Sequence, residues 1–535
     1  MIIKNGTVYD PMNGIDGEKK DLFIKDGKIV EEADGKEIDA YGLIVLPGGV
    51  EIHTHIAGSK VNLGRLFRPE DHRKDPVLRT GVTRSGVGYT VPTTFVTGYR
   101  YVKLGYTTLM EAAVPPLGAR HTHEELNDIP IVDKGCYTLM GNNYFVLRYI
   151  KEKDFEKLKN FVAWLLKATR GYVVKIVNPG GVENWKWGRN VNSIDDRVYN
   201  YEVTPREILT GLAKVNEELK LPHPIHVHCN NLGVPGNFET TAESINAIKE
   251  RIHITHIQFN SYAGDSWANL ASGAAELARR INQRENVTCD MGQVIFDDAT
   301  TMTADGPMQY GLYKKTGNKW YNSDVEMEEG AGVVPHVYKA KSPVNSVQWA
   351  IGLEMALLVK DPWKFFLTTD HPNGGPFYHY PEVISWLMSK RARDQMLQSV
   401  HRFASSRTSL GGIDREYSLF EIAIITRAAA AKRLGLRQKG HLGVGADADV
   451  AIYEFRGDDV KRSFSRAKYV IKDGKIVAKD GEIVESPQGR TYWVNAGGEV
   501  TDEIREAFSK YYTVSLENYP VQDEYLPRGE MISCG

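Results

Sequence analysis

The middle of the chain alternates between segments typical of strands and segments typical of helices, and this alternation constrains the fold more than any other feature. The strand-like runs, rich in apolar and β-branched residues, lie at 42–46, 107–110, 137–140, 172–177, 224–228, 251–256, 287–290 and 365–368. Repeated strand–helix units of this kind form a parallel sheet with the helices outside. We therefore expect an α/β fold, a TIM-like (β/α)8 barrel, over residues 47–435. An open doubly wound sheet is the alternative.

Two helices carry clear start signals. Thr204 and Glu207 form a capping box, with Pro205 at the first helical position. The capping pattern recurs at residues 418–421, before a long helical run that is expected to end near Gly435. Both helices lie in the expected barrel, so they support its alternation of strands and helices.

The heptapeptide Ile-Lys-Asp-Gly-Lys-Ile-Val occurs twice, at residues 24–30 and 471–477. Each copy predicts a β-hairpin, because Asp-Gly tolerates the positive φ of a tight turn between strand-forming residues. Chance recurrence is the alternative, since such turns are common. The copies flank a different middle, which favours a small β-sandwich domain formed from both chain ends. The expected division is residues 1–46 and 436–500 for this β-domain, 47–435 for the barrel, and 501–535 for a C-terminal extension.

Composition excludes several classes of function. With 535 residues and a formal net charge of -2, the chain offers no electrostatic basis for binding nucleic acid. No stretch approaches the roughly 18–20 apolar residues of a membrane span, and the first residues lack the pattern of a signal peptide, so a cytoplasmic location is expected. The four cysteines are far apart, which argues against a disulfide scaffold and against an iron–sulfur cluster held by this chain alone.

Several strand-like runs end in a side chain that can bind a metal. One apolar run delivers His53 and His55 two positions apart, so that both imidazoles face one side of a strand. The later strand ends carry Glu111, Lys175, His228, His256, Asp290 and Asp370. In a βα barrel the active site is assembled from the carboxyl ends of the strands, and nitrogen and oxygen ligands suit zinc. The expected metal ligands are His53, His55, Lys175, His228, His256 and Asp370.

Each of these residues has an ordinary structural explanation when taken singly. A lone His-x-His pair is often coincidental, a lysine that ends an apolar strand can extend its ammonium to solvent, and Asp370 could cap the next helix. His226 and His253 lie earlier on their strands and are expected to pack beside the ligands or to support them. Six such residues in order along successive strands favour a metal site over coincidence.

The pattern resembles that of the metal-dependent amidohydrolase superfamily. The shared features are a proline-glycine strand leading into His-x-His, here Pro47 through His55, and then a lysine, two histidines and an aspartate on later strands. Glu51 stands where the superfamily usually has aspartate. The resemblance implies two Zn2+ ions. It also implies that Lys175 is carboxylated by carbon dioxide, because an ammonium offers no acceptor to a cation whereas carbamate oxygens can bridge two ions.

A closer resemblance is to the A subunits of formylmethanofuran dehydrogenase, and it covers essentially the whole chain. The segments that carry it are 56–62, 68–71, 119–125, 141–143, 300–308, 346–352 and 491–494. That family joins formate to the primary amine of methanofuran as an N-formyl amide, within an oxidoreductase complex of methanogenesis. The resemblance implies partner subunits: a tungsten- or molybdenum-pterin subunit like formate dehydrogenase, which reduces carbon dioxide, and iron–sulfur subunits.

A hypothesis for the mechanism follows from this resemblance. His53, His55 and Asp370 hold one ion, His228 and His256 hold the other, and carboxylated Lys175 bridges them. Asp370 is also expected to be catalytic, by moving a proton between the attacking hydroxide and the amine nitrogen. The expected substrate contacts, each of which could equally stabilise a loop or lie on the surface, are His121, His123, Arg100, Asn230 and Asn231.

Three other functions stay open. One is a formylmethanofuran hydrolase subunit of a formyltransferase/hydrolase complex, which works without a metal–pterin partner. Another is a cyclic amidohydrolase of the dihydroorotase or hydantoinase type, which fits less well with the long segment between Asp290 and Asp370. The third is a scaffold subunit with a decayed site, and the complete set of six ligands argues against it.

Overall fold

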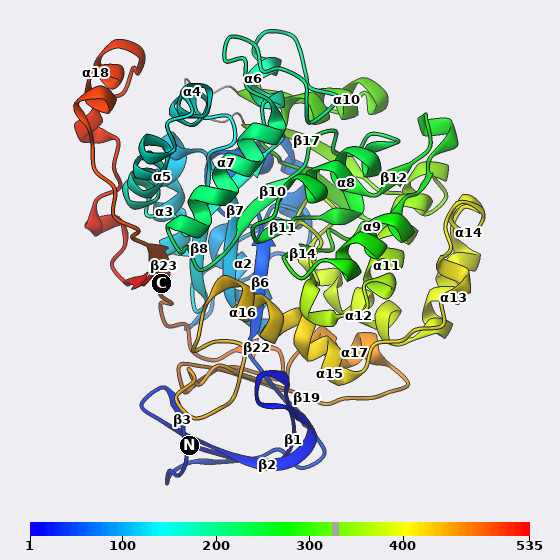
Figure 1. Cartoon of the computed structure of the whole chain (residues 1–535). Helices are drawn as coiled ribbons and strands as arrows, with labels where there is room; N and C mark the ends of the chain where they lie inside the picture. Colours follow the sequence, from blue (N-terminus) through cyan, green and yellow to red (C-terminus); the bar gives the residue numbers. More distant parts are fainter. Residues whose placement is uncertain (324–330, 535) are drawn as a thin grey trace.

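Eight parallel strands form the centre of the molecule (Figure 1). The structure, a computed structural model, describes residues 1–323 and 331–534. In chain order the barrel strands are β6 (Gly49–Thr54), β7 (Tyr106–Val114), β8 (Asp133–Leu139), β9 (Val173–Val177), β10 (Ile225–His228), β11 (Ile252–Ile254), β14 (Val287–Asp290) and β18 (Phe365–Phe366). A parallel bridge between Thr54 and His371 brings the segment after β18 beside β6, so the sheet nearly closes. The expected (β/α)8 barrel is confirmed, and the open doubly wound sheet is excluded.

Helices lie between successive barrel strands and cover the barrel from outside (Figure 1). They are α1 (Ser59–Phe67), α2 (Thr94–Lys103), α3 (Ala119–Asp128), α4 (Tyr144–Glu152), α5 (Phe155–Thr169), α6 (Gly181–Trp185), α7 (Pro205–Glu218), α8 (Asn237–Ala247), α9 (Ala274–Gln283), α10 (Gly306–Thr316), α11 (Pro343–Leu358), and, after β18, α12 (Tyr380–Met388), α13 (Lys390–Ser399), α14 (Phe403–Arg407), α15 (Leu419–Ala423) and α16 (Ala429–Leu434). The expected capping box begins α7, where the Thr204 hydroxyl and the Glu207 carboxylate each accept a bond from the other's backbone N–H. The second box begins α15 at Ser418, and α16 is capped at its carboxyl-terminal end by Gly435, which has a φ of 73°.

Both chain ends contribute to a second sheet of nine strands, which lies below the barrel in Figure 1. Its strands are β1 (Ile2–Asp10), β2 (Ile15–Lys25), β3 (Lys28–Val30), β4 (Glu37–Asp39), β5 (Ile44–Pro47), β19 (Val450–Tyr453), β20 (Tyr469–Lys472), β21 (Lys475–Lys479) and β22 (Glu482–Ile483). The repeated heptapeptide forms two hairpins, with Asp26 and Gly27 joining β2 to β3, and Asp473 and Gly474 joining β20 to β21, all four at positive φ. The two turns touch, since a Cβ on Gly27 would lie 3.3 Å from the Asp473 carbonyl oxygen. The β-domain built from both chain ends is confirmed.

Two strand segments have other neighbours than expected. The run 42–46 contributes β5 to the nine-stranded sheet, where it pairs with β1 and β19, and the first barrel strand is β6. In the sequence, the hydrophobic residues on either side of Gly48 look like one continuous strand. In the structure, the chain leaves the nine-stranded sheet at Gly48 and enters the barrel. Conversely β23 (Thr491–Val494), within the range 436–500, pairs in parallel with β8 of the barrel. The expected domain boundaries stay a prediction.

The remaining elements lie around the barrel. After β23 the chain forms α18 (Asp502–Tyr511) and β24 (Gly529–Ile532), and β24 pairs in parallel with β23. The long segment between β14 and β18 carries a small antiparallel sheet of β15 (Asp298–Thr301), β16 (Tyr321–Ser323) and β17 (Ala331–Val337). Within residues 1–323 and 331–534, every helix is too short or too polar to cross a membrane.

Candidate functional site

Six side chains that can bind metals lie at the carboxyl-terminal ends of the barrel strands. We call them the six-residue cluster: His53, His55, Lys175, His228, His256 and Asp370. Each lies on a barrel strand or within four residues of its end, so the closure of the barrel directs all of them toward one place. All six are buried, with exposed fractions from 0% to 4%.

The distances within the six-residue cluster are those of direct contacts. The Nε2 atoms of His53 and His55 lie 2.8 Å and 3.2 Å from Asp370 Oδ1. The ring centroids of His228 and His256 are 4.8 Å apart, and those of His53 and His256 are 5.3 Å apart. His53, His55 and Asp370 thus form a group compact enough for one ion, with ligand atoms within 4.8 Å of one another. The other two imidazoles lie directly beside it.

Lys175 lies among these imidazoles with no hydrogen-bond partner for its Nζ in the described part of the chain. Burial lowers the pKa of Lys175 to about 7, although the nearby carboxylates of Asp370 and Asp290 favour the charged form. Burial also holds the pKa values of His53 and His256 well below 6.5. A buried, unpaired lysine whose pKa lies near neutral pH is uncommon, and groups with such perturbed pKa values cluster at functional sites.

The backbone at two members of the cluster is in the left-handed region. His256 has a φ of 36° and Asp370 a φ of 50°. Residues other than glycine adopt this region rarely, at a cost of roughly 1–3 kcal/mol, and they concentrate at functional sites. The surrounding structure therefore enforces the position of these two side chains.

Glu111, on β7, holds His55 from the side opposite Asp370. Its Oε1 lies 3.4 Å from His55 Nδ1 and 2.9 Å from Lys60 Nζ, and its Oε2 accepts two backbone N–H groups of the loop after β6. Burial would raise the pKa of Glu111, but Lys60 and His55 outweigh burial and lower the pKa to about 2. The charged carboxylate thus faces Nδ1 of His55 and leaves Nε2 to face Asp370.

Asp305 contacts His228, and sequence reasoning did not place it in the site. Its Oδ2 lies 3.0 Å from His228 Nε2, while its Oδ1 accepts from Asn178 Nδ2 at 3.0 Å and from the backbone N–H of Met308 at 3.2 Å. Asp305 is the N-cap of α10, which begins with a glycine and a proline. That sequence signal predicts the cap. It does not predict the contact with a histidine 77 residues away along the chain.

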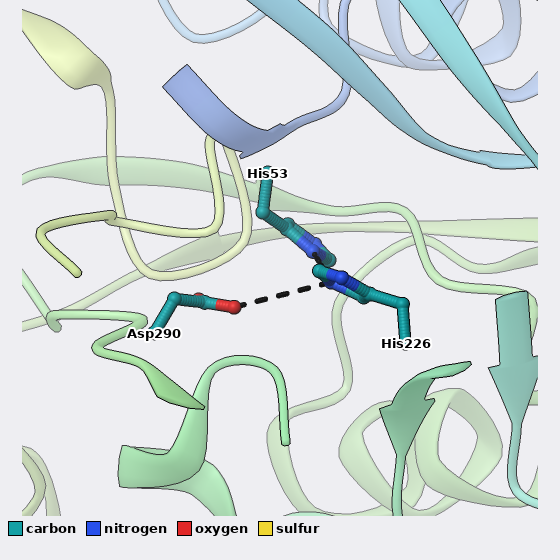
Figure 2. A group of neighbouring side chains, drawn as sticks. All are labelled: His53, His226 and Asp290. Carbon is teal, nitrogen blue, oxygen red and sulfur yellow. Dashed lines mark hydrogen bonds and ion pairs between the residues drawn. The ribbon is translucent and has the colours of Figure 1, made fainter. Parts of the chain in front are cut away.

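The side chains of His53, His226 and Asp290 point toward one another, as Figure 2 shows. His53 Nδ1 is 2.9 Å from His226 Nε2, and the nearest Asp290 oxygen is 3.9 Å from that same His226 nitrogen. The Asp290 carboxylate is engaged elsewhere, because it accepts from His253 Nε2 and from the backbone N–H of His256, both at 2.9 Å. His226 and His253 thus pack beside the six-residue cluster.

Comparison with known proteins identifies the family. The profile of the Amidohydrolase family matches residues 36–478, which include all eight barrel strands and part of the β-domain. The chain belongs to the amidohydrolase family. It is therefore an enzyme that acts on C–N bonds, and the six-residue cluster is its candidate metal centre.

Two relatives resemble this amidohydrolase along its whole length. Protein FwdA from Methanocaldococcus jannaschii is 53% identical over 551 aligned positions, which cover 98% of this chain and 97% of FwdA. The A subunit of the formyltransferase/hydrolase complex Fhc from Methylorubrum extorquens is 38% identical, with 99% of each chain covered. In the crystal structure of that complex, FhcABCD with methylofuran, one chain matches with a TM-score of 0.95 at 37% identity, covering 100% of this chain and 99% of its own length. The resemblance found in the sequence is confirmed over the whole chain.

Five further residues of the amidohydrolase were expected to contact substrate, and the structure gives each one a protein partner. The pairs are His121 with Asn62, His123 with the Thr169 carbonyl, Arg100 with Tyr378 and the Gly88 carbonyl, Asn230 with Asn178, and Asn231 with the Asn192 carbonyl. His121 is exposed on α3, whereas His123, Arg100 and Asn230 are buried. Contact of these five residues with substrate stays a prediction.

Glu51, which departs from the superfamily pattern, lies against the backbone of His53. It accepts a hydrogen bond from the Tyr380 hydroxyl and another, at 3.2 Å, from the His53 N–H. Burial raises the pKa of Glu51 to about 8 despite these bonds. At neutral pH this carboxyl is therefore mostly protonated, and it supports the strand without adding a full charge under the amidohydrolase site.

A surface cavity of about 570 Å³ lies at the opposite end of the barrel, next to the amino-terminal ends of the strands. Its lining includes Leu221, Arg251 and Lys439 and none of the six-residue cluster. The six-residue cluster is therefore separated from this cavity by the length of the barrel.

Proposed function

We propose that this amidohydrolase is the A subunit of a formylmethanofuran dehydrogenase. In that role it condenses formate with the primary amine of methanofuran and catalyses the reverse hydrolysis. The observation that carries the proposal is the 53% identity to FwdA along 98% of the chain. The buried six-residue cluster supports it, because it gathers nitrogen and oxygen donors at the end of the barrel where such enzymes work.

We propose two Zn2+ ions as cofactors, and the donor set fits them. Zinc binds imidazole nitrogen and carboxylate oxygen at about 2.0–2.2 Å, so neighbouring ligand atoms on one tetrahedral ion lie about 3.3–3.6 Å apart. The distance from His55 to Asp370, 3.2 Å, is close to this length, and the distance from His53 to Asp370, 2.8 Å, is shorter. Lys175 Nζ and Asp370 Oδ2 are also buried without hydrogen-bond partners among the described residues.

We propose that the ligands divide between the two ions: His53, His55 and Asp370 would hold one, and His228 and His256 the other, with Lys175 shared. When bound, the ions would polarise the formyl oxygen and lower the pKa of a water molecule from about 15.7 toward about 7. The contacts of His55 with Glu111 and of His228 with Asp305 would keep one nitrogen of each ring available for this purpose.

Lys175 is proposed to carry a carboxyl group from carbon dioxide. Its pKa of about 7 leaves a large share of the amine neutral at neutral pH, and only the neutral amine has the electron pair that attacks carbon dioxide. One N–C bond forms and one proton leaves the nitrogen, so the product is a carbamate with two oxygens. The side chain then offers acceptors where an ammonium offers donors alone.

Asp370 is proposed to move the proton of the reaction. Its Oδ1 faces His53 and His55, whereas its buried Oδ2 has no hydrogen-bond partner among the described residues. This second oxygen can therefore take a proton from the attacking water during hydrolysis and return it to the amine nitrogen as the C–N bond breaks. The reverse order serves the condensation.

We also propose that the chain works within a multisubunit complex. The four cysteines are widely spaced in the sequence, so reduction of carbon dioxide to formate is assigned to a tungsten- or molybdenum-pterin subunit and to iron–sulfur subunits.

The second candidate function is a hydrolase subunit of a formyltransferase/hydrolase complex, favoured by the TM-score of 0.95 to the chain in FhcABCD. Purification of the native assembly decides between the two. Tungsten or molybdenum with iron–sulfur subunits supports the first, and zinc with formyltransferase-type partners alone supports the second.

Hydrolysis of formylmethanofuran by the purified enzyme tests the site, with Lys175→Ala and Lys134→Ala as a matched pair. Both lysines are buried with a pKa of about 7, but Lys134 lies on β8 and donates to the Ile129 carbonyl at 3.1 Å. Lys175→Ala is expected to lose zinc and roughly 100-fold in kcat/KM, whereas Lys134→Ala keeps both. Full zinc and activity in Lys175→Ala would remove the carbamate bridge. Hydrolysis of dihydroorotate or a hydantoin instead of formylmethanofuran would rule out the proposed substrate.

A further inference from the structure

Three buried imidazoles form a continuous hydrogen-bonded chain that starts at the six-residue cluster. His53 Nδ1 lies 2.9 Å from His226 Nε2, and His226 Nδ1 lies 3.1 Å from His223 Nε2. The chain ends at the backbone carbonyl of Arg433 on α16, 3.1 Å from His223 Nδ1. All three rings are at most 1% exposed. Both nitrogens of His226 and of His223 are thus occupied, and the chain passes from the candidate metal centre to a fixed point of the backbone.

The carbonyl at the end sets the direction of every bond in the chain. A carbonyl oxygen accepts and cannot donate, so His223 must carry its proton on Nδ1. In a neutral imidazole the other nitrogen is then an acceptor, which requires His226 to donate from Nδ1. By the same reasoning His226 Nε2 accepts from His53, so the proton of His53 lies on Nδ1 and the lone pair on Nε2. The reverse direction would place a lone pair of His223 against the carbonyl oxygen.

The surroundings of the chain agree with this direction. Asp290 Oδ2 lies 3.9 Å from His226 Nε2, too far to accept a proton from it, and is bonded instead to His253. The Thr255 hydroxyl lies 2.6 Å from His53 Nδ1 and serves as a second acceptor for that N–H. His53, His226 and Asp290 come close enough together to be considered as a separate metal site. The 2.9 Å between the two ring nitrogens is instead a normal hydrogen bond (Figure 2).

The direction of these hydrogen bonds also decides what His53 presents to Asp370. The lone pair of His53 Nε2 faces Asp370 Oδ1 at 2.8 Å, so two acceptors meet in a buried place. A cation beside them, bound to both atoms, would satisfy both.

We propose that His226 and His223 are positioning residues. Because the Arg433 carbonyl can only accept, their hydrogen bonds fix His53 in the tautomer that has its proton on Nδ1 and a free lone pair on Nε2. This inference rests on the zinc site of the proposed function. It assigns a role to His223, which is two hydrogen bonds removed from any ligand and would otherwise be a packed core residue. Partners of metal-bound histidines commonly contribute a factor of 10 to 100 in metal affinity.

The deciding variant is His223→Phe, which keeps an aromatic ring but removes the acceptor for His226. The matched control is Tyr172→Phe, because the buried Tyr172 hydroxyl donates to the Leu434 carbonyl at 2.7 Å, next to Arg433 on the same helix end. Both variants lose one buried hydrogen bond to this helix. Zinc affinity, measured by competition with a chelator, is expected to fall about tenfold for one ion in His223→Phe and to stay unchanged in Tyr172→Phe. The visible spectrum of the cobalt-loaded enzyme should shift in His223→Phe alone.

The outcomes distinguish a failure of the proposed hydrogen-bond relay, from the Arg433 carbonyl through His223 and His226 to His53, from a failure of the proposed zinc site. Zinc affinity within twofold of wild type in His223→Phe, with a loss of thermal stability like that of Tyr172→Phe, would overturn the relay while leaving the proposed function intact. A wild-type enzyme that binds no zinc would overturn both. Should His223→Phe fail to fold, His226→Gln and His226→Leu decide. The glutamine carbonyl can still accept from His53 Nδ1, so an equal loss of affinity in these two variants would contradict the relay, and retention in the glutamine variant alone would support it.

Discussion

Three of the four histidines in the six-residue cluster have a neighbouring side chain at one ring nitrogen, and the partners differ from one histidine to the next. His53 has an imidazole, His55 a glutamate paired with lysine, and His228 the carboxylate of Asp305. A neutral imidazole has a single lone pair, so a partner that accepts at one nitrogen frees the other for a metal. The affinity of the centre is therefore expected to depend on residues that never touch an ion.

Asp305→Asn is expected to weaken the binding of one of the two proposed zinc ions by about 10- to 100-fold and to leave the binding of the other unchanged. The Asp305 carboxylate accepts from Asn178 and Met308 with one oxygen and from His228 with the other. An asparagine has one acceptor oxygen, so it cannot serve both sides. Zinc content during a chelator titration measures the effect, and Asp154→Asn, at the N-cap of α5, is the control. Equal loss of both ions, or of neither, would contradict this assignment of Asp305.

At the scale of elements, the sequence predicted features that depend on neighbouring residues and missed those that depend on distant ones. The capping box at Thr204 and the two Asp-Gly hairpins are local, and they formed where the pattern placed them. The chain switches sheets at Gly48 within one apolar run, where hydrophobicity carries no signal of the change. Asp305 reads as an ordinary helix cap because its second contact comes from a strand that only the closed barrel brings near.

Thr204→Ala is expected to lower the free energy of unfolding by about 1 kcal/mol, the usual contribution of an N-cap side chain. The variant leaves the N–H of Glu207 without its side-chain acceptor and the first turn of α7 frayed. Thr204→Ser should retain nearly all of the stability, since it keeps the hydroxyl. Urea denaturation measures both, and zinc content is expected to stay at the wild-type level because the Thr204 and Glu207 side chains bond to each other's backbone at an exposed site. Loss of zinc in Thr204→Ala would show that the start of this helix also supports the site.

At the scale of the whole molecule, a buried group of charges joins the β-domain to the barrel. Asp133 at the start of β8 faces Lys439, Lys472 and Arg490, at 2.5 Å, 3.1 Å and 3.2 Å. Asp133, Asp447 and Asp473 come near enough to one another to hold a metal ion, but Lys439 contacts the first two and Arg490 contacts all three. The members are spread from residue 133 to residue 490, so the sequence alone does not bring them together. Their separation explains why this junction could not be predicted whereas the hairpins could.

Asp133→Asn is expected to destabilise the protein by about 1.5–3 kcal/mol at neutral pH, because Lys439, Lys472 and Arg490 lose one shared anion but keep other aspartate partners. Burial alone would raise the pKa of Asp133, but Lys439, Lys472 and Arg490 outweigh burial and hold the pKa well below 3.8. The stabilisation is therefore complete above the unfolded pKa of about 3.9 and is lost as the pH falls through the lower folded value. The difference between wild type and variant should shrink as the pH drops below 4. Asp480→Asn, which breaks an exposed pair with Lys468, is the control and should change stability by less than about 1 kcal/mol. Denaturant unfolding at several pH values measures both variants, and a loss in Asp133→Asn that is small and independent of pH would mean that other contacts hold the two domains together.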